Sequence, residues 1–253
     1  MKILGIIPAR YNSTRFPGKP LADICGKSMI QRVYERALMS PSLSLVAVAT
    51  DDQRIFDHVR NLGRFGYFSI AVKTDENLPN GTARCEQALR KLNDVCPKVD
   101  AVINIQGDEP LLDPVMIDEV AEMLADGENC ATLCREIRNE DDMNNPNVVK
   151  VVMSQNRNAL YFSRSLIPYN RTGINTPVYQ HIGIYGYKAK FLREYVKMND
   201  TPLSMAESLE QLKILENGYR IRVKVTSSRK DIIGVDTPED LEKVRKIIEN
   251  AEI

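Results

Sequence analysis

Short, almost wholly apolar runs alternate with longer amphipathic stretches in the first half of the chain. The runs cover 3–7, 45–50 and 101–105, and continuous apolar segments of this length are typical of strands buried on both faces of a sheet. Between them, apolar residues recur every three or four positions over 29–38 and 55–62, which predicts amphipathic helices. This alternation favours an α/β fold: a Rossmann-like, mostly parallel sheet flanked by helices.

Capping residues predict where three further helices begin. Asn80-Gly81-Thr82 opens a helix that runs to about Lys91, and Pro114 stands where the first turn of another helix would place it. The last helix has the clearest start, with Thr237 as N-cap, Pro238 as first residue and Asp240 completing a capping box. We therefore expect the chain to end in a well-defined helix.

The second half mixes strand and helix patterns without a regular alternation. Strands are predicted over 147–153, 159–163, 181–188 and 220–226, and helices over about 189–198 and 205–216. No linker, repeat or low-complexity tract divides the chain. We expect a single domain over 1–253 with a smaller mixed lobe at about 150–215.

Composition and charge narrow the partners. The 253 residues include 34 Lys and Arg against 34 Asp and Glu, so the zero net charge argues against a nucleic-acid coat or a polybasic membrane surface. No apolar run approaches the ~18 residues of a membrane span, and no signal peptide is recognisable. The five cysteines form no C-x-x-C pair, which favours free thiols and a cytoplasmic location (Cys25, Cys85, Cys96, Cys130, Cys134).

The loop after the first strand, residues 8–20, carries three cations: Arg10, Arg15 and Lys19. Ligands of open α/β sheets bind beyond the carboxyl ends of strands, and guanidinium and ammonium groups there suit a triphosphate, with Ser13 and Thr14 between them. The loop lacks the G-x-G-x-x-G fingerprint, which sets aside a nicotinamide dehydrogenase, and it lacks the phosphate loop of NTPases. The alternative is a merely solvated surface loop.

Two aspartates in distant segments form a candidate metal site. Asp108 follows the predicted strand at 101–105, Asp236 precedes the last helix, and Gly107 lets the backbone approach a ligand closely. Mg²⁺ takes carboxylate oxygens together with water and substrate phosphate. The segment 99–134 holds nine acids and no Lys or Arg, which favours a cation. Each aspartate also has a plain alternative, as a turn former or as an acid beside a helix N-terminus.

Motifs along nearly the whole chain resemble one family. The first is I-I-P-A-R-Y-x-S-T-R-F-P-G-K-P-L, and it is followed in family order by A-T-D-D at 49–52, N-I-Q-G-D-E-P at 104–110, A-L-Y-F-S-R at 159–164, H-I-G-I-Y-G-Y at 181–187, L-E-Q-L at 209–212 and V-D-T-P-E-D-L at 235–241. Together they resemble the 3-deoxy-manno-octulosonate (Kdo) cytidylyltransferases, also called CMP-Kdo synthetases. The resemblance implies that the smaller lobe serves sugar binding and dimerisation.

The resemblance also implies roles for individual residues. Catalysis would involve Arg10, Lys19, Asp108 and Asp236, with Asp108 and Asp236 holding Mg²⁺. The nucleotide would contact Pro8, Ala9, Arg10, Arg15, Lys19, Gly81, Arg84, Gln106 and Gly107. The sugar acid would contact Gln106, Arg164, His181, Tyr185, Glu210 and Gln211. A histidine such as His181 in an apolar run is also compatible with a purely structural role.

The expected reaction is CTP + Kdo → CMP-Kdo + diphosphate, in a homodimer that supplies lipopolysaccharide synthesis. The chain departs from the family's S-G-T-E-R at Asn80 and Ala83, and the lost glutamate is a carboxylate that could orient Arg84. It departs again at Ser204, on the sugar side. Alternatives are a related sugar acid (8-amino-Kdo or a sialate-type acid), UTP or GTP with a sugar phosphate, and a non-catalytic nucleotide-binding protein.

Overall fold

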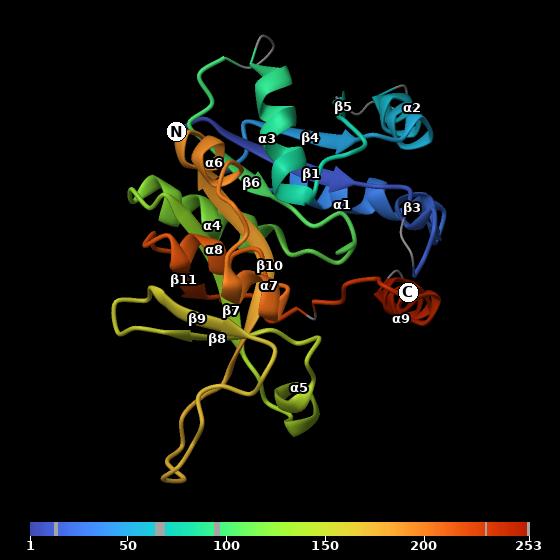
Figure 1. Ribbon diagram of the computed structural model, residues 1–253. Helices are drawn as coiled ribbons and strands as arrows, with labels where there is room; N and C mark the ends of the chain where they lie inside the picture. Colours follow the sequence, from blue (N-terminus) through green and yellow to red (C-terminus); the bar gives the residue numbers. More distant parts are fainter. Residues whose placement is uncertain (13–14, 64–68, 94–96, 231, 252–253) are drawn as a thin grey trace. The chain divides into compact units, whose positions relative to one another are not determined.

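The computed structural model describes residues 1–12, 15–63, 69–93, 97–230 and 232–251 (Figure 1). The chain forms two compact units. The first combines Met1–Asp118 with Ser228–Ile253, and the second is Glu119–Ser227. The smaller lobe predicted at about 150–215 falls within the second unit.

The first unit contains a parallel sheet of four strands. Its order is β6 (Ala101–Asn104), β1 (Ile3–Ala9), β4 (Leu45–Thr50) and β5 (Ala71–Lys73). Neighbouring strands pair in parallel, with Ile6 opposite Ala47 on one side and opposite Asn104 on the other. The three apolar runs are therefore strands, and their nearly complete burial agrees with a sheet covered on both faces.

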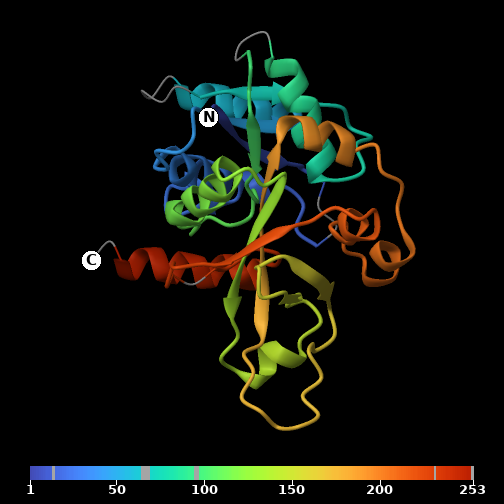
Figure 2. The same cartoon turned by 90° about the vertical axis from the view of Figure 1, so that its left-hand side faces the viewer.

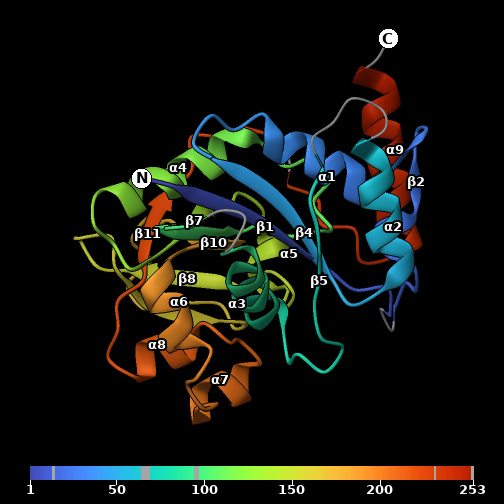
Figure 3. The same ribbon diagram turned by 90° about the horizontal axis from the view of Figure 1, so that it is seen from above.

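Helices flank this sheet on both sides. Helices α1 (Met29–Leu38) and α3 (Gly81–Leu92) lie on opposite faces, and α2 (Gln53–Leu62) packs beside β4 and β5 (Figure 3). Each begins at a side-chain N-cap: Ser28, Asp52 and Asn80 accept a hydrogen bond from a backbone N–H of the first turn. The predicted start of α3 at Asn80-Gly81 is thereby confirmed.

The C-terminal helix α9 (Pro238–Ala251) packs against a segment near the N-terminus. Its apolar face joins Leu241, Val244 and Ile248 to Ile24 and Met29 in one cluster. Ile24 belongs to a small antiparallel hairpin of β2 (Asp23–Ile24) and β3 (Lys27–Ser28). The predicted capping box is present, because Asp240 N–H donates to Thr237 Oγ1 and Thr237 N–H donates to Asp240 Oδ2. The start of α9 is thus fixed next to the core of the first unit.

The second unit is built on mixed strands. Strand β7 (Cys130–Glu136) pairs in parallel with β11 (Arg222–Val225) and antiparallel with β10 (Tyr179–Lys188). Strand β8 (Lys150–Met153) is antiparallel to both β10 and β9 (Ala159–Ser163). Helix α4 (Pro114–Ala125) begins at the predicted proline and belongs to this unit from Glu119 onward. Its Leu124 lies where a Cβ on Gly186 of β10 would meet it at 2.7 Å. A side chain at 186 would therefore displace α4.

Four short helices complete this unit: α5 (Glu140–Asn144), α6 (Ala189–Tyr195), α7 (Pro202–Glu207) and α8 (Leu212–Glu216) (Figure 2). The single helix predicted over 205–216 is wrong. Ser208 adopts a left-handed conformation with φ 51°, which ends α7 and separates it from α8. Strands β2, β3, β5 and β7 were not predicted.

The helices and cysteines bear on the predictions about membrane insertion and disulfides. None of the helices that the structure describes is long and apolar enough to cross a membrane. Cys25, Cys85, Cys130 and Cys134 are free thiols, and Cys96 lies outside the described residues.

Candidate active site

Three of the predicted nucleotide-binding residues meet at the carboxyl end of the parallel sheet in the first unit. Pro8 lies near the end of β1, where Ala9 is buried as its last residue. A Cβ on Gly107 would come within 2.8 Å of the Pro8 carbonyl oxygen, and a Cβ on Gly81 within 3.2 Å of Pro8 Cγ. Glycine at 81 and 107 therefore allows the start of α3 and the segment after β6 to approach β1.

The loop that follows β1 is closed by a glycine turn. Gly18 has φ 74° and donates its N–H to the Tyr11 carbonyl over 2.9 Å. The Tyr11 ring packs under the Arg54 guanidinium, whose carbon lies 3.2 Å from the ring centroid. This turn leads into the 3-10 helix η1 (Lys19–Leu21) and fixes the backbone of Lys19. Ser13 and Thr14 lie outside the described residues.

Lys19 brings the two predicted metal ligands together. Its Nζ lies 2.8 Å from Asp108 Oδ2 and 3.3 Å from Asp236 Oδ1. Arg15 Nη2 lies 3.2 Å from the other oxygen of Asp236. A backbone hydrogen bond of 2.9 Å from Val235 N–H to the Asp108 carbonyl holds the two aspartate-bearing segments side by side. Four predicted site residues from three distant segments of the sequence therefore form one cluster.

These two carboxylates fit a magnesium ion that also uses substrate oxygens. Among the residues with described positions, no group of three or more His, Cys, Asp or Glu side chains could hold a metal ion. Mg²⁺ needs no such cage, because one or two carboxylates suffice when phosphate and water supply the remaining ligands. The donor set at Asp108 and Asp236 is of that kind.

Most of the acidic segment 99–134 serves other contacts. Asp118 accepts from Ser40 at 2.5 Å, Glu119 from Thr226 at 2.6 Å, and Asp113 from Ser228 at 2.7 Å. Glu122 pairs with Lys224 and Glu128 with Arg222. Five of the nine acids therefore have partners elsewhere, and Asp108 is the member that joins the Lys19 cluster.

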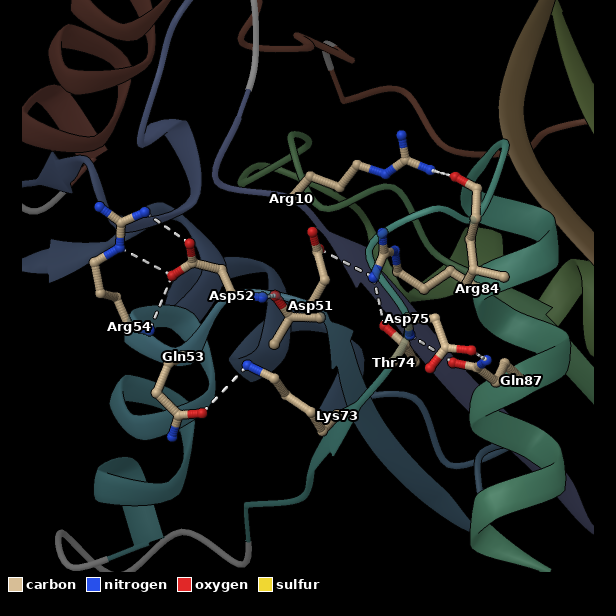
Figure 4. A network of polar contacts seen from close by, with 12 residues as sticks. Arg10, Asp51, Asp52, Gln53, Arg54, Lys73, Thr74, Asp75, Arg84 and Gln87 are labelled. Atoms are coloured by element: carbon tan, nitrogen blue, oxygen red, sulfur yellow. Dashed lines mark hydrogen bonds and ion pairs between the residues drawn. The ribbon is translucent and has the colours of Figure 1, made fainter.

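Arg84 lies in a second, buried network of the first unit (Figure 4). Its side chain is 0% exposed, its Nη1 lies 3.0 Å from Asp51 Oδ1, and it donates to Thr74 Oγ1. Burial lowers the pKa of the Arg84 guanidinium, and the Asp51 carboxylate partly opposes this shift. Within the described structure, Arg84 Nε and Nη2 have no hydrogen-bond partner. Both donors are enclosed by protein atoms.

The carboxylate beside Arg84 comes from Asp51. Position 83, where the family has a glutamate, is an alanine in this chain. Asp51 stands in the A-T-D-D motif after β4, so the sequence contained the signal but not the contact. Arg10 does not join the Lys19 cluster among the contacts that the structure describes; it is exposed and donates to the Leu78 carbonyl ahead of α3 (Figure 4). Gln106 is half-buried, two residues after the end of β6.

Except for Gln106, which belongs to the first unit, the predicted sugar-binding residues lie in the second unit, where His181 and Tyr185 share an aromatic cluster on β10. The His181 ring centroid lies 5.2 Å from that of Tyr185 and 5.1 Å from that of Phe162. His181 Nε2 is 3.0 Å from Thr132 Oγ1. Burial lowers the pKa of His181 to about 3, so the ring is neutral and offers hydrogen bonds rather than positive charge.

Arg164 is extensively bonded to the protein. Its guanidinium donates to the carbonyls of Glu207 at 2.7 Å, Pro146 at 3.0 Å and Ser208 at 3.3 Å. The Glu207 carboxylate in turn accepts from Arg164 N–H at 2.9 Å and Ser163 Oγ at 2.6 Å. Arg164 thus connects the end of β9 to the end of α7.

Glu210 and Gln211 follow this connection directly. Gln211 is buried at the start of α8, and the Glu210 carbonyl accepts from the Tyr195 hydroxyl at 2.9 Å. Sequence reasoning missed Glu207, although it stands just ahead of the L-E-Q-L motif. Its role depends on contacts with β9 that no local pattern reports.

Comparison with known proteins decides the family. Residues 4–230 match the family described as cytidylyltransferase. The chain belongs to the cytidylyltransferase family. The family accounts for nearly all the motifs in the sequence, and the expectation of a nucleotidyltransferase enzyme is confirmed.

Cytidylyltransferases of two bacteria match along nearly their full length. A protein of Fusobacterium nucleatum named 3-deoxy-manno-octulosonate cytidylyltransferase is 48% identical over 255 residues, covering 100% of this chain and 99% of the relative. One of Shewanella pealeana named 8-amino-3,8-dideoxy-manno-octulosonate cytidylyltransferase is 47% identical over 244 residues, covering 95% and 96%. The resemblance to the Kdo cytidylyltransferases is thereby confirmed.

A solved cytidylyltransferase structure confirms the fold. The structure of CMP:2-keto-3-deoxy-manno-octonic acid synthetase complexed with CTP matches with a TM-score of 0.90 and 39% identity, covering 99% of this chain and 100% of that chain. The predicted α/β fold with a mostly parallel sheet flanked by helices is therefore confirmed. The roles of the individual site residues stay predictions.

Proposed function

We propose that this cytidylyltransferase catalyses the Mg²⁺-dependent reaction CTP + Kdo → CMP-Kdo + diphosphate. Full-length relatives named for this activity support the choice of substrates. The observation that carries the chemistry is the meeting of Asp108 and Asp236 at the Lys19 ammonium. Two carboxylates beside two cations provide, in one place, groups for a metal ion and groups for a triphosphate.

Positioning and charge neutralisation account for the proposed reaction. The anomeric hydroxyl of Kdo attacks the α-phosphate in line while diphosphate leaves with its negative charge. Arg15 and Lys19 bind the departing phosphates, and each cation ~4 Å from a phosphate contributes roughly 4 kcal/mol before desolvation at intermediate dielectric. Mg²⁺, when held by Asp108 and Asp236, would neutralise phosphate charge and orient the attacking oxygen.

We propose that Arg84 takes part in base recognition once nucleotide binding uncovers its side chain, which is 0% exposed in this structure. Its Nε and Nη2 are buried donors without an acceptor in the described part of the protein, and cytosine presents a carbonyl oxygen and a ring nitrogen as acceptors. A buried donor left unpaired costs about 1–3 kcal/mol, so a base that satisfies it is favoured over one that does not. Asp51 keeps the guanidinium in place for this contact.

On the sugar side, we propose that neutral His181 and the side chains of Tyr185, Glu210 and Gln211 bind sugar hydroxyl groups. Arg164 has three backbone carbonyl partners, so it acts there first as the group that holds this segment together. The 8-amino analogue of Kdo is a second candidate substrate, because the Shewanella pealeana relative is named for it.

The test is diphosphate release from the purified chain with CTP and Mg²⁺, offering Kdo and 8-amino-Kdo in parallel. We expect release with CTP and one of the two sugar acids, and none with UTP or GTP. The better acceptor identifies the substrate. No release with either acid would refute the proposed reaction.

Asp108→Asn tests the proposed metal site. The change removes one charge and keeps the shape, and we expect at least ~100-fold slower diphosphate release, the order seen when a group that stabilises transition-state charge is lost. Asp113→Asn is the matched control, because Asp113 lies five positions on and binds Ser228 instead. Turnover of Asp108→Asn at the control rate would contradict the site.

We also propose that the enzyme is a homodimer and that its product supplies lipopolysaccharide synthesis. A long connection joins β9 to β10 (Figure 2). It exposes Leu166, Tyr169 and Ile174, with Tyr169 at 88% exposure. Large exposed apolar side chains in one segment are typical of a surface that a partner covers. Light scattering of the purified chain should give twice the monomer mass. The Tyr169→Asp variant should give the mass of a single monomer.

A further inference from the structure

We propose that Lys19 is an internal counter-cation of the nucleotide-free enzyme. Its ammonium lies between the two carboxylates that a divalent ion would use, so Asp108 and Asp236 bind metal tightly only after a nucleotide has drawn Lys19 away. This inference rests on the proposed function insofar as the same aspartates hold the metal and the same lysine binds phosphate. It adds an order of events: the nucleotide, or a nucleotide that already carries the metal, must come first.

The contacts of Lys19 carry the inference. The ammonium makes ion pairs of 2.8 Å with Asp108 Oδ2 and 3.3 Å with Asp236 Oδ1, one oxygen from each carboxylate. A metal ion held by the two aspartates would compete with the ammonium for the same two carboxylates. The Lys19 side chain is only 13% exposed, whereas those of Asp108 and Asp236 are 32% and 47% exposed. The ammonium is thus the more enclosed partner, on the inner side of the pair.

The backbone keeps the ammonium in this place. Lys19 opens η1, where the Ala22 N–H donates to its carbonyl at 3.1 Å and Pro20 is buried. Gly18, with its positive φ, sets the direction in which the chain enters η1. Because the Lys19 backbone is fixed, moving the ammonium requires rotation of its side chain alone. A long, flexible lysine can make that change at low cost once another anion is available.

Charge balance explains why metal alone should bind weakly. Asp108 and Asp236 face Lys19 and Arg15, so the cluster has two negative and two positive groups and no net attraction for a cation. A triphosphate supplies several negative charges and competes for both cations. Once Lys19 turns to phosphate, the carboxylates are left with an uncompensated charge that favours a divalent ion. Nucleotide and metal would therefore bind with positive coupling.

A Lys19 that served only to bind the nucleotide phosphates would behave differently. If Lys19 stood apart from the carboxylates until nucleotide arrived, its removal would leave metal binding by the free enzyme unchanged. The counter-cation role instead predicts a gain of binding, because deletion of Lys19 frees both carboxylates. A merely structural lysine would give a loss, as the cluster came apart.

The experiment is a titration of the full chain with Mn²⁺ in the absence of nucleotide, followed by the electron paramagnetic resonance signal of free Mn²⁺. Lys19→Met keeps the length and removes the charge, and we expect it to bind Mn²⁺ at least ~10-fold more tightly than the unmodified chain. Lys27→Met is the control, because Lys27 pairs with Glu35 and not with the aspartates. Its affinity should stay unchanged.

A double variant locates the gained site. Adding Asp108→Asn to Lys19→Met should abolish the gain, and saturating non-hydrolysable CTP analogue should narrow the difference between Lys19→Met and the unmodified chain. Equal or weaker Mn²⁺ binding by Lys19→Met, with an unchanged circular dichroism spectrum, would overturn the inference. If that variant does not fold, Lys19→Gln is measured in its place and the same outcomes apply.

Failure of this inference can be told from failure of the proposed function. Suppose that the unmodified chain releases diphosphate from CTP and Kdo but the Lys19→Met variant gains no Mn²⁺ affinity. Only the counter-cation role is then refuted. If Lys19→Met gains Mn²⁺ affinity but the unmodified chain releases no diphosphate, the proposed reaction is refuted and the role of Lys19 is supported.

Discussion

At the scale of single residues, burial and partners decide what each charged side chain can do. Arg84 is fully buried beside Asp51, whereas Arg54 makes a similar two-residue pair with Asp52 in an exposed position. Breaking a buried pair leaves an uncompensated charge, which costs about 3–5 kcal/mol, and an exposed pair contributes only about 0–1 kcal/mol. The neighbouring aspartates 51 and 52 therefore provide a matched comparison.

We predict that Asp51→Asn lowers the free energy of unfolding by about 3 kcal/mol, because Arg84 then lacks its ion-pair partner at 3.0 Å. Urea denaturation of the purified variant measures the change. Asp52→Asn should have little effect, since asparagine also serves as an N-cap for α2 and the pair with Arg54 is exposed. If the two variants lost equal free energy of unfolding, the Arg84–Asp51 pair would not have the larger contribution expected of a buried ion pair.

At the scale of elements, hydrogen bonds of Glu207 hold the end of α7 against the end of β9. Its carboxylate accepts from Ser163 Oγ and from Arg164 N–H, and Arg164 returns a hydrogen bond to the Glu207 carbonyl. Burial raises the pKa of Glu207, but these hydrogen bonds and the positive charge of Arg164 outweigh it and hold the pKa below its ordinary value. The segment that carries Glu210 and Gln211 begins directly after this attachment.

We predict that Glu207→Gln raises the KM for the sugar acid at least ~10-fold and leaves the KM for CTP unchanged. The amide loses a charge-assisted hydrogen bond, worth about 1.5–3 kcal/mol, and the sugar-binding segment loses its fixed position. Steady-state diphosphate release gives both constants. Glu136→Gln, at an exposed position of the same unit, is the control. Equal increases in both KM values would indicate general loss of structure.

The same carboxylate has a pH signature. Because its folded-state pKa lies below the ordinary value, Glu207 stabilises the folded protein above that ordinary value, and the contribution is lost as the pH falls toward the folded-state pKa. In Glu207→Gln this part of the acid sensitivity should be absent.

At the scale of the whole molecule, the half-buried His181 links stability to pH. The unfolded chain protonates this ring below about pH 6.5, whereas the folded protein, with a pKa lowered to about 3 by burial, does so only in stronger acid. Since the unfolded state binds the proton more readily, the free energy of unfolding falls as the pH drops below 6.5 and continues to fall until about 3.

We predict that the unmodified chain loses about 2 kcal/mol between pH 7 and pH 5 through this one residue. In His181→Asn that part of the loss should disappear, as measured by urea denaturation at both pH values. The pKa of His58 is also lowered by burial, so His58→Gln is the comparison variant. If His58→Gln flattened the profile and His181→Asn did not, the assignment to His181 would be wrong.

Local patterns in the sequence determine much of this protein by themselves. The apolar runs at 3–7, 45–50 and 101–105 predict the strands of the parallel sheet, and Asn80 and Thr237 predict helix starts that the structure confirms. These signals are local, because periodicity and capping depend on residues within a few positions of each other. The order of motifs likewise indicates the family.

Tertiary structure alone decided which of the candidate residues work together. The α9 cluster brings Asp236 back to Asp108, Lys19 joins the two, and most acids of 99–134 are tied to other partners. Ser208 ends a helix that the apolar pattern alone would continue, and Asp51 pairs with Arg84 across a separation of 33 residues. A sequence reports which groups are present and how nearby residues fold. Contacts between distant segments depend on how the apolar faces pack, and no local pattern encodes that packing.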